Sequence, residues 1–421
     1  MLIWQNPLEF AYSISTDKNY QENWIFLYSG LDGKTSYLAL YPKKEIIADD
    51  FKKLENEFNK NNKLWFGYLG YGLKNSLENL PKDQKSLVNL PNLWMINFNL
   101  VLEFDHVNQQ IISHFSDAKF LQKIPVPKKI TSKLLAKISD LKSNFSKKQY
   151  LKKVEIIKNK ITDGEFYQAN LTRKFYGKFK LISGNVFDLF VKLNKTSPAN
   201  YSAFLKLGEN HIISSSPELF LLIENNGQII SSPIKGTAPR SLNKKIDLLN
   251  KNNLKKDLKE CSENLMIVDL VRNDLSRNCL IGSVEVKNLF KISSYKTIHH
   301  MSSDICGIKN KESSALDVIK NCFPPGSMTG APKIKAMEVC SKLEKNSRGI
   351  YSGAIGFLSR DICNLSVVIR TILIRKDSLE FQVGGAITFD SNPINEWQET
   401  MEKATGISKA LGIRLADLKK R

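Results

Sequence analysis

The stretch from Gly353 to Thr388 reads GAIGFLSRDICNLSVVIRTILIRKDSLEFQVGGAIT and contains three apolar runs separated by short polar turns. Runs rich in β-branched residues between such turns are typical of β-strands. The expected strands span 353–358, 364–374 and 379–388. Helical periodicity is found on both sides, at 332–344 and at 394–411. Strands enclosed by helices predict an α+β protein with the helices outside β-sheet.

More helices are expected on the amino-terminal side of this stretch. Apolar spacing places two of them around 257–276 and 313–321. A third begins at Ser146, because Ser146-Lys-Lys-Gln149 has the spacing of a capping box and apolar residues follow on one helical face. The region from this helix onwards therefore alternates helices with β-type runs.

The first 115 residues differ, because short β-type runs follow one another and only one amphipathic helix, near 48–60, is expected. A Lys/Ser-rich stretch over 116–145 contains two prolines and then a helical segment. This composition indicates a connection between two regions. The sequence thus predicts an amino-terminal β-rich region (1–115), a connecting segment (116–145) and a larger carboxy-terminal region (146–421).

The bulk composition is that of a globular protein, with 421 residues of which 42% are hydrophobic and 25% charged. The net charge of +20 comes from scattered lysines without an arginine-rich run, so we expect no nucleic-acid partner. No apolar stretch approaches the eighteen or so residues that a membrane span needs, and the start lacks a signal-peptide pattern. Six widely spaced cysteines favour reduced thiols, so we expect a cytoplasmic protein without membrane contact.

Two pairs of carboxylates stand at i, i+3 on expected helices, Glu260 with Glu263 and Glu396 with Glu399. Each pair projects from one helical face. Four oxygen donors from two helices can hold a hard cation such as Mg²⁺. The alternative is that these glutamates belong to solvated helix surfaces, where most glutamates lie.

Two further segments can carry chemistry. Phe323–Lys333 places glycines and a serine before Pro332, so free backbone amides at a helix start can face a carboxylate, although an ordinary Gly/Pro-rich turn has the same composition. Its glycines are too close together for a nucleotide-binding loop. Lys235 follows a β-type run in Pro233-Ile-Lys-Gly-Thr237 and acts as a nucleophile only if its pKa is lowered, which is rare among lysines.

In this order the motifs resemble the chorismate-utilising enzymes, a family that includes anthranilate synthase, aminodeoxychorismate synthase, isochorismate synthase and salicylate synthase. The resemblance is dense over 146–412 and looser at Phe66–Tyr71 and Leu100–His106. The matching stretches are Tyr167–Arg173, Ser215–Phe220, Pro233–Thr237, Glu263–Arg277, Gly326–Lys333 and Val383–Ala386, followed by Glu396 and Glu399. The resemblance implies a fold of two β-sheets packed face to face with outer helices, in which 146–421 is the chorismate-binding catalytic region.

The resemblance also implies site residues. The four glutamates correspond to a Mg²⁺ site that draws in the ring carboxylate of chorismate. Arg370 and Tyr351 correspond to residues that hold the enolpyruvyl carboxylate, and His300 to a catalytic histidine near the ring hydroxyl. Other substrate-binding positions implied are Gln168, Ser327, Gly384, Gly385 and Lys403.

The branches of the family differ in what attacks the ring. Water-using relatives carry a lysine where this chain has Gln168, which cannot serve as a general base. Most anthranilate synthases have alanine where this chain has Lys235, whereas P-I-K-G-T resembles aminodeoxychorismate synthases. The implied mechanism has Lys235 adding to C2, Glu218 protonating the leaving C4 hydroxyl, and ammonia then entering at C4.

No glutaminase segment is found in the sequence, so we expect a separate glutaminase subunit to supply the ammonia. The expected product is 4-amino-4-deoxychorismate, a precursor of 4-aminobenzoate and folate. The nearest alternative is an anthranilate synthase component I. A non-catalytic, ligand-binding member of the fold is an alternative from a different class.

Overall fold

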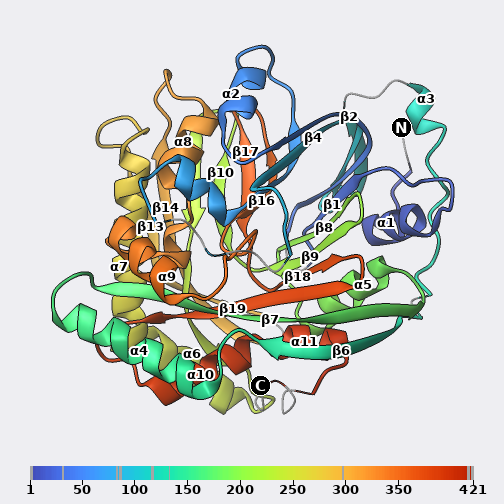
Figure 1. Cartoon of the computed structure of the whole chain (residues 1–421). Helices are drawn as coiled ribbons and strands as arrows, with labels where there is room; N and C mark the ends of the chain where they lie inside the picture. The colour runs from blue at the N-terminus through green and yellow to red at the C-terminus, as the bar shows by residue number, and fades with distance from the viewer. Residues whose placement is uncertain are drawn as a thin grey trace.

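The computed structural model describes residues 3–30, 33–81, 84, 88–114, 118–131, 133–295, 298–414 and 418. Within these ranges the strands form one antiparallel hydrogen-bonded network (Figure 1). The network has two arms that meet at the long strand β4 (Leu93–Asp105), which also pairs with β5 (Gln110–His114). These two arms position the site described below.

The first arm runs outward from β4 by successive pairings that join distant parts of the sequence. In order of pairing its strands are β2 (Thr35–Ala48), β1 (Trp24–Tyr28), β8 (Tyr201–Leu207), β9 (Asn210–Ser216), β18 (Thr371–Arg375), β19 (Ser378–Ile387), β7 (Gln168–Ser183) and β6 (Leu135–Ser143). The two-residue strand β15 (Gly330–Ala331) also pairs with β7. The amino-terminal and carboxy-terminal parts of the chain therefore share this arm.

The second arm begins at the other edge of β4. Its strands are β3 (Trp65–Leu69), β16 (Ala354–Leu358), β17 (Cys363–Val367), β10 (Leu219–Ile223), β11 (Gln228–Ser232), β14 (Ile298–Ile308) and β13 (Glu285–Ser294), with β12 (Ile234–Pro239) beside β14. A buried apolar core takes side chains from both arms, including Ile25 and Leu205 from the first and Phe66 and Ile355 from the second. The two arms thus pack face to face, and the expected α+β fold is confirmed.

Helices cover the outer faces of the arms (Figure 1). The first arm packs with α1 (Pro7–Thr16), α5 (Val186–Thr196) and α11 (Thr405–Leu411). The second packs with α2 (Lys52–Phe58), α7 (Leu258–Ser276) and α8 (Ala315–Cys322). A third group, α4 (Lys147–Thr162), α9 (Lys333–Leu343) and α10 (Pro393–Lys403), lies against β7 and β19. The remaining helical segments are α3 (Ala118–Leu121), α6 (Lys244–Lys256), η1 (Tyr71–Ser76) and η2 (Gly326–Met328).

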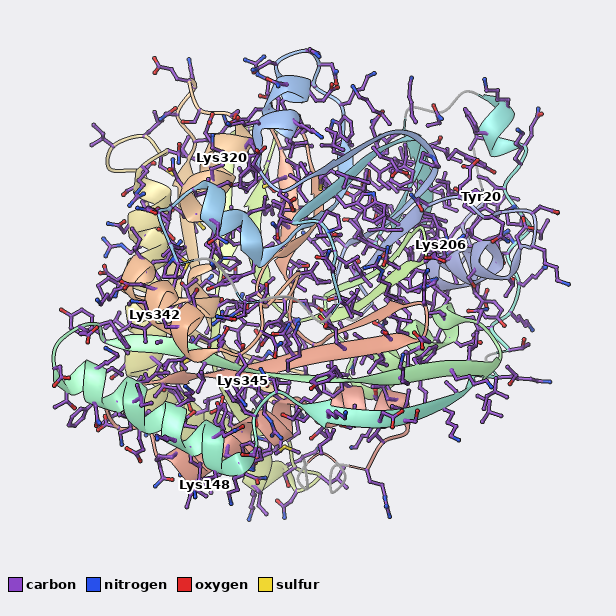
Figure 2. All side chains as sticks on the ribbon, viewed as in Figure 1. Tyr20, Lys148, Lys206, Lys320, Lys342 and Lys345 are labelled. Atoms are coloured by element: carbon purple, nitrogen blue, oxygen red, sulfur yellow. The ribbon has the colours of Figure 1, made fainter. Side chains whose placement is uncertain are left out.

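The surface carries lysines over many elements instead of in one patch. Figure 2 labels Lys148 on α4, Lys206 on β8 and Lys320 on α8, which lie over different parts of the molecule. All six cysteines carry free thiols, and five of them are buried. Among the described helices, none combines the length and the apolar character needed to cross a bilayer.

Several details of the expected secondary structure were wrong. The helical segment expected within 116–145 is strand β6, because its backbone pairs with the long strand β7. A helix, α1, lies in the amino-terminal region, where only the helix near 48–60 was expected; Asn6 caps it and Pro7 begins it. The expected helix at 394–411 is two helices, α10 and α11.

The strand expected at 364–374 is interrupted by Arg370, whose φ of 49° lies in the left-handed region. By contrast, the capping box at Ser146 is confirmed, because both of its hydrogen bonds with Gln149 are present. The boundary expected between residues 115 and 116 falls outside the described residues. The division of the chain into three regions therefore remains a prediction from the sequence.

Candidate active site

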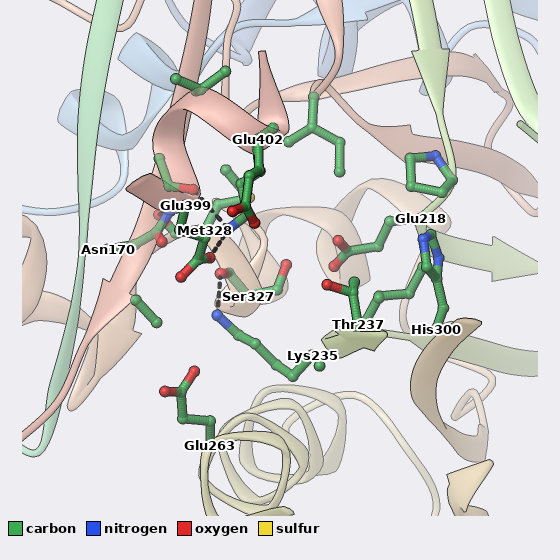
Figure 3. Close-up of a pocket in the computed structure, with 18 of the residues that line it drawn as sticks. Asn170, Glu218, Lys235, Thr237, Glu263, His300, Ser327, Met328, Glu399 and Glu402 are labelled. Carbon is green, nitrogen blue, oxygen red and sulfur yellow. Dashed lines mark hydrogen bonds and ion pairs between the residues drawn. The ribbon is translucent and has the colours of Figure 1, made fainter. Parts of the chain in front are cut away.

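A cavity of about 460 Å³ opens where the ends of the two arms come together between α7 and α10 (Figure 3). Strand β12 and strand β14 contribute from the second arm, and β19 contributes from the first. Of the residues predicted from the sequence, those lining the cavity are Glu218, Lys235, Glu260, Glu263, His300, Ser327, Tyr351, Arg370, Gly384, Glu399 and Lys403. The fold thus brings together residues that are up to 185 positions apart in the sequence.

Three predicted residues do not line this cavity. Gly385 and Glu396 lie directly behind its wall, since a Cβ placed on Gly385 would lie 3.3 Å from Glu396 Oε2. Gln168 is fully buried on β7, beside Ala331 of β15. Neither polar atom of its amide has a hydrogen-bond partner among the described residues. A substrate-binding role for Gln168 therefore remains a prediction from the sequence.

Lys235 extends from β12 into the cavity, and its side chain is partly accessible from there (Figure 3). Its Nζ donates a hydrogen bond to the carbonyl oxygen of Ser327 at 3.3 Å. No carboxylate of the described residues forms an ion pair with it. Burial lowers the pKa of Lys235, although Glu263 partly opposes this effect. Burial thus favours the neutral amine of Lys235, the form that can act as a nucleophile.

Glu218 lies between β9 and β10, on the same side of the cavity as His300 (Figure 3). Its backbone is fixed, because its amide bonds to Ser216 Oγ and its carbonyl accepts from the Val367 amide. The side chain is 4% exposed, and burial raises the pKa of Glu218 to about 7 against the opposing hydrogen bond from Ser327. A carboxyl group with this pKa can donate a proton near neutral pH.

His300 and Arg370 form a contact at the inner end of the cavity. His300 is buried, and burial together with the charge of Arg370 lowers the pKa of His300 to about 3. Its Nε2 lies 3.4 Å from Arg370 Nη2, so the neutral ring accepts there and carries its hydrogen on Nδ1. That Nδ1 has no partner among the described residues. The arrangement leaves a neutral donor beside a guanidinium.

Tyr351 lines the cavity as a second neutral donor. Its side chain is buried, and burial raises the pKa of Tyr351 to about 12. The phenol therefore keeps its proton at neutral pH. Together with the Arg370 guanidinium it offers the donors that suit a carboxylate ligand.

The four predicted metal-binding glutamates face one another from two helices, Glu260 and Glu263 from α7 and Glu396 and Glu399 from α10. Burial raises the pKa of Glu260, Glu263 and Glu396, and the neighbouring carboxylates act in the same direction. Burial acts likewise on Glu399, but the ion pair with Lys403 outweighs it and the net pKa of Glu399 is lowered. The four carboxyl groups thus disfavour one another's ionised forms, and only Glu399 has an ion pair strong enough to reverse this effect.

Two lysines contact this cluster. Lys403 Nζ lies 2.5 Å from Glu399 Oε1 and donates to the carbonyl of Gly384 at 2.8 Å. Lys259 Nζ lies 3.4 Å from Glu396 Oε1 and 3.8 Å from Glu263 Oε1. Each lysine thus holds a carboxylate of α10.

In the described part of the chain, no three His, Cys, Asp or Glu side chains lie close enough together to hold a metal ion in their present positions. The residues nevertheless fit a hard cation. Glu396 Oε2 is buried and lacks a hydrogen-bond partner among the described residues. A Cβ on Gly385 would lie 3.3 Å from this oxygen and 3.5 Å from Glu399 Oε1, so both oxygens border the space that the glycine leaves open. An all-oxygen, anionic donor set of this kind suits Mg²⁺.

The comparisons with known proteins agree with this geometry. Residues 15–409 match the family of chorismate binding enzymes. The chain belongs to this family. Aminodeoxychorismate synthase component 1 of Salmonella typhimurium is 35% identical over 350 residues, which cover 81% of this chain and 75% of that protein.

Two anthranilate synthases are also similar to this chorismate-binding enzyme. Component 1 of Lactococcus lactis is 30% identical over 362 residues, covering 82% of this chain and 78% of that protein. The crystal structure of component I from Streptococcus pneumoniae TIGR4 has a TM-score of 0.79 at 26% identity, covering 97% of this chain and 99% of that chain. The protein is thus a chorismate-utilising enzyme.

Several cavity-lining residues of this chorismate-binding enzyme were not predicted from its sequence. Asn170 follows Gln168 by two positions on β7, and its Nδ2 is 3.4 Å from the Met328 carbonyl oxygen. Thr237 follows Lys235 by two positions and lies beside it in Figure 3. Polar residues at alternate positions of a strand were the available signal. The others are Lys259, Gln382, Asn395, Gln398 and Glu402.

A buried ion pair behind the cavity was also missed. Arg348 makes two hydrogen bonds to Glu344, at 2.8 and 2.9 Å. Its remaining donors reach the carbonyl oxygens of Met328 at 2.8 Å and Asn170 at 2.7 Å. The pair thereby holds the backbone of Met328, which follows Ser327, and the backbone of Asn170 on β7. Glu344 caps the end of α9 and Arg348 lies in the loop after it, and the sequence alone gives no sign that such a pair is buried.

Proposed function

We propose that this chorismate-utilising enzyme is an aminodeoxychorismate synthase that makes 4-amino-4-deoxychorismate from chorismate and ammonia. The observation that carries the proposal is the position of Lys235, which faces the cavity with a lowered pKa and without an ion pair among the described residues. Glu218, a carboxyl group with a pKa of about 7, lies in the same cavity. Burial thus shifts the pKa of the amine and that of the acid in the directions that favour this reaction.

The proposed reaction uses two displacements. The neutral Lys235 amine forms a bond to ring C2, the two conjugated ring double bonds both shift, and the C4 hydroxyl leaves as water after taking the proton of Glu218. Ammonia then bonds to C4, both double bonds shift back, and the C2–nitrogen bond breaks to release Lys235. The proton lost by the new ammonium group returns to the Glu218 carboxylate, which restores the starting state. Each displacement has a side chain of this protein in the role of nucleophile, acid or leaving group.

The other residues hold the substrate in this scheme. Arg370 and Tyr351 bind the enolpyruvyl carboxylate through a guanidinium and a neutral phenol. His300 donates from Nδ1 to a ring oxygen, because its Nε2 is already engaged by Arg370. The backbone of Gly384 and the Ser327 hydroxyl line the ring, while Gly385 leaves room beside the carboxylates. Lys403 fixes the Gly384 carbonyl and balances the charge of Glu399.

Glu260, Glu263, Glu396 and Glu399 would hold Mg²⁺, which supplies positive charge to attract the ring carboxylate of chorismate and to offset its repulsion by the acidic cluster. Ammonia would come from a separate glutaminase subunit. Relatives of this chain that carry the designation component 1, including the Salmonella typhimurium protein, support a two-component enzyme. We place the reaction in the cytoplasmic route to 4-aminobenzoate and folate.

An anthranilate synthase component I is the second candidate, because the Lactococcus lactis and Streptococcus pneumoniae proteins are similar over most of the chain. Both reactions use chorismate and ammonia, but the products differ. Anthranilate formation releases pyruvate, whereas aminodeoxychorismate keeps its enolpyruvyl group. If ammonia attacks C2 directly, as in anthranilate formation, Lys235 forms no covalent bond with the substrate.

The test is a product assay. The purified chain is incubated with chorismate, Mg²⁺ and an ammonium salt at mildly alkaline pH, beside the Lys235→Ala variant, and products are identified by chromatography and mass. We expect 4-amino-4-deoxychorismate from the wild type, and its conversion to 4-aminobenzoate by an added lyase. Anthranilate together with pyruvate would instead establish the second candidate. No turnover of chorismate would favour a non-catalytic member of the fold.

A further inference from the structure

Lys259 bridges the two helices that carry the acidic cluster. Its Nζ lies 3.4 Å from Glu396 Oε1 on α10 and 3.8 Å from Glu263 Oε1 on its own helix, α7. One ammonium group thus contacts a carboxylate from each of the two pairs. A metal ion shared by the same pairs would make the same connection, so the lysine and the metal compete for the same carboxylate groups.

The two lysines of the cluster are held in different ways. Lys403 donates to the backbone carbonyl of Gly384 in addition to its ion pair with Glu399, and a backbone atom cannot follow the side chain away. Both side chains are partly exposed, Lys259 at 39% and Lys403 at 45%, but Lys259 contacts only carboxylates among the described residues. Lys259 can therefore leave its partners for solvent by side-chain rotation, while Lys403 stays in place.

The charges leave room for a further cation. With the four glutamates ionised and the two lysines protonated the net charge is −2, so the ionised cluster attracts a divalent ion even with both lysines present. Mg²⁺ demands oxygens at about 2.0–2.1 Å in near-octahedral geometry. The carboxylates cannot close to that distance around an ion while the ammonium group of Lys259 separates Glu396 from Glu263.

We propose that Lys259 is an exchangeable internal counter-cation, which holds Glu396 and Glu263 in the metal-free protein and leaves them when a divalent cation binds. The inference rests on the metal site of the proposed function. It assigns a task to a residue outside the predicted site, and it accounts for the lack of a ready-made metal group among the described residues. The free energy of the ion pair then opposes metal binding.

Isothermal titration calorimetry of the metal-free chain with MgCl₂ tests the exchange. We expect Lys259→Met to bind Mg²⁺ about three- to tenfold more tightly than the wild type, because no lysine has to be displaced. Lys256→Met is the matched control, since it removes the same charge from the exposed end of α6, and it should change the affinity little. Lys259→Arg, which keeps the charge, should remain close to the wild type.

Thermal unfolding gives a second readout that does not depend on turnover. Without metal, Lys259→Met should melt below the wild type, and saturating Mg²⁺ should close the gap. An affinity of Lys259→Met that is unchanged or weaker than that of Lys256→Met would overturn the exchange. The Glu396→Gln variant tests whether the metal site exists, separately from the exchange of Lys259. If this variant binds Mg²⁺ like the wild type, or if the wild type binds none, the proposed metal site is wrong. The ammonium-dependent product assay judges the proposed function separately.

Discussion

The two walls of the cavity differ in whether their buried charged groups form ion pairs. On the strand wall, which carries Glu218 and Lys235, neither group has an ion pair among the described residues, and burial shifts both pKa values towards neutrality. On the helix wall, formed by α7 and α10, Lys259 and Lys403 are paired with glutamates, which raises the pKa of each lysine despite burial. The first wall thus carries the groups with the shifted pKa values expected of an acid and a nucleophile, and the second carries ion pairs around the proposed metal site.

The largest effect expected on the strand wall follows from Lys235→Ala. Without the amine no bond to C2 forms, so formation of 4-amino-4-deoxychorismate should fall on the order of a thousandfold or more in kcat, with the chorismate KM within a few-fold of the wild type. Steady-state kinetics with ammonium salt measure both constants. Retained activity would show that the strand wall does not supply the nucleophile. The difference in ion pairing between the two walls would then have no connection with catalysis.

Glu218→Gln should have the next largest effect, lowering kcat by about a hundredfold or more, since glutamine cannot donate the proton. In the wild type, kcat/KM should decline above the Glu218 pKa of about 7 as the acid ionises. The variant should lack this decline while still losing activity at low pH, where Lys235 becomes protonated. A pH profile of the two proteins checks this; identical profiles would remove Glu218 from the role of acid.

The two walls should also respond in opposite directions to loss of a lysine. Lys235→Met removes an amine that has no ion pair among the described residues and should raise the stability at pH 7, because a lowered pKa means that folding disfavours the charged form. Lys403→Met leaves Glu399 without its partner and should lower the stability by about 1 kcal/mol, a modest value because the side chain is accessible from the cavity. Urea unfolding measures both. Equal shifts of the same sign would contradict the comparison.

The smallest effect is expected far from the cavity. Lys342 and Glu338 form an exposed i, i+4 pair on α9 at 2.6 Å. Lys342→Met should change the free energy of unfolding by only about 0.3–0.5 kcal/mol. The same urea experiment provides this value as a baseline for the cavity variants. A cost as large as that of Lys403→Met would mean that the helix wall is no more sensitive than ordinary surface.

Local signals in the sequence predicted much of this structure. The capping box of Ser146 and Gln149 fixes the start of α4 by contacts between near neighbours, and the apolar runs at 353–388 locate the carboxy-terminal strands. Strand β6 was missed because its polar, half-exposed residues carry no strand signal of their own. Its conformation comes from pairing with β7, whose bonded residues lie 32–48 positions away.

The same distinction, between local signals and distant contacts, applies to the residues of the candidate site. Glu218, Lys235 and the four glutamates were named because their motifs are ordered along the chain as in the family, and the fold gathers them at one cavity or directly behind its wall. Lys259 was not named, since a lysine beside a glutamate on a helix is common in this sequence. Only the approach of α10, more than 130 residues later, turns it into a bridge. Burial that depends on such distant contacts leaves no local pattern.

The left-handed backbone at Arg370 places two separate demands on one position. The φ of 49° suits glycine or asparagine better than arginine, while the proposed carboxylate binding beside His300 depends on the guanidinium of Arg370. Residues that relieve the backbone strain at this position would therefore lose the proposed contact with the substrate carboxylate. Long charged side chains would keep the positive charge but would leave the backbone strained. A library at this single codon would separate foldability from activity, with different residues enriched by each selection.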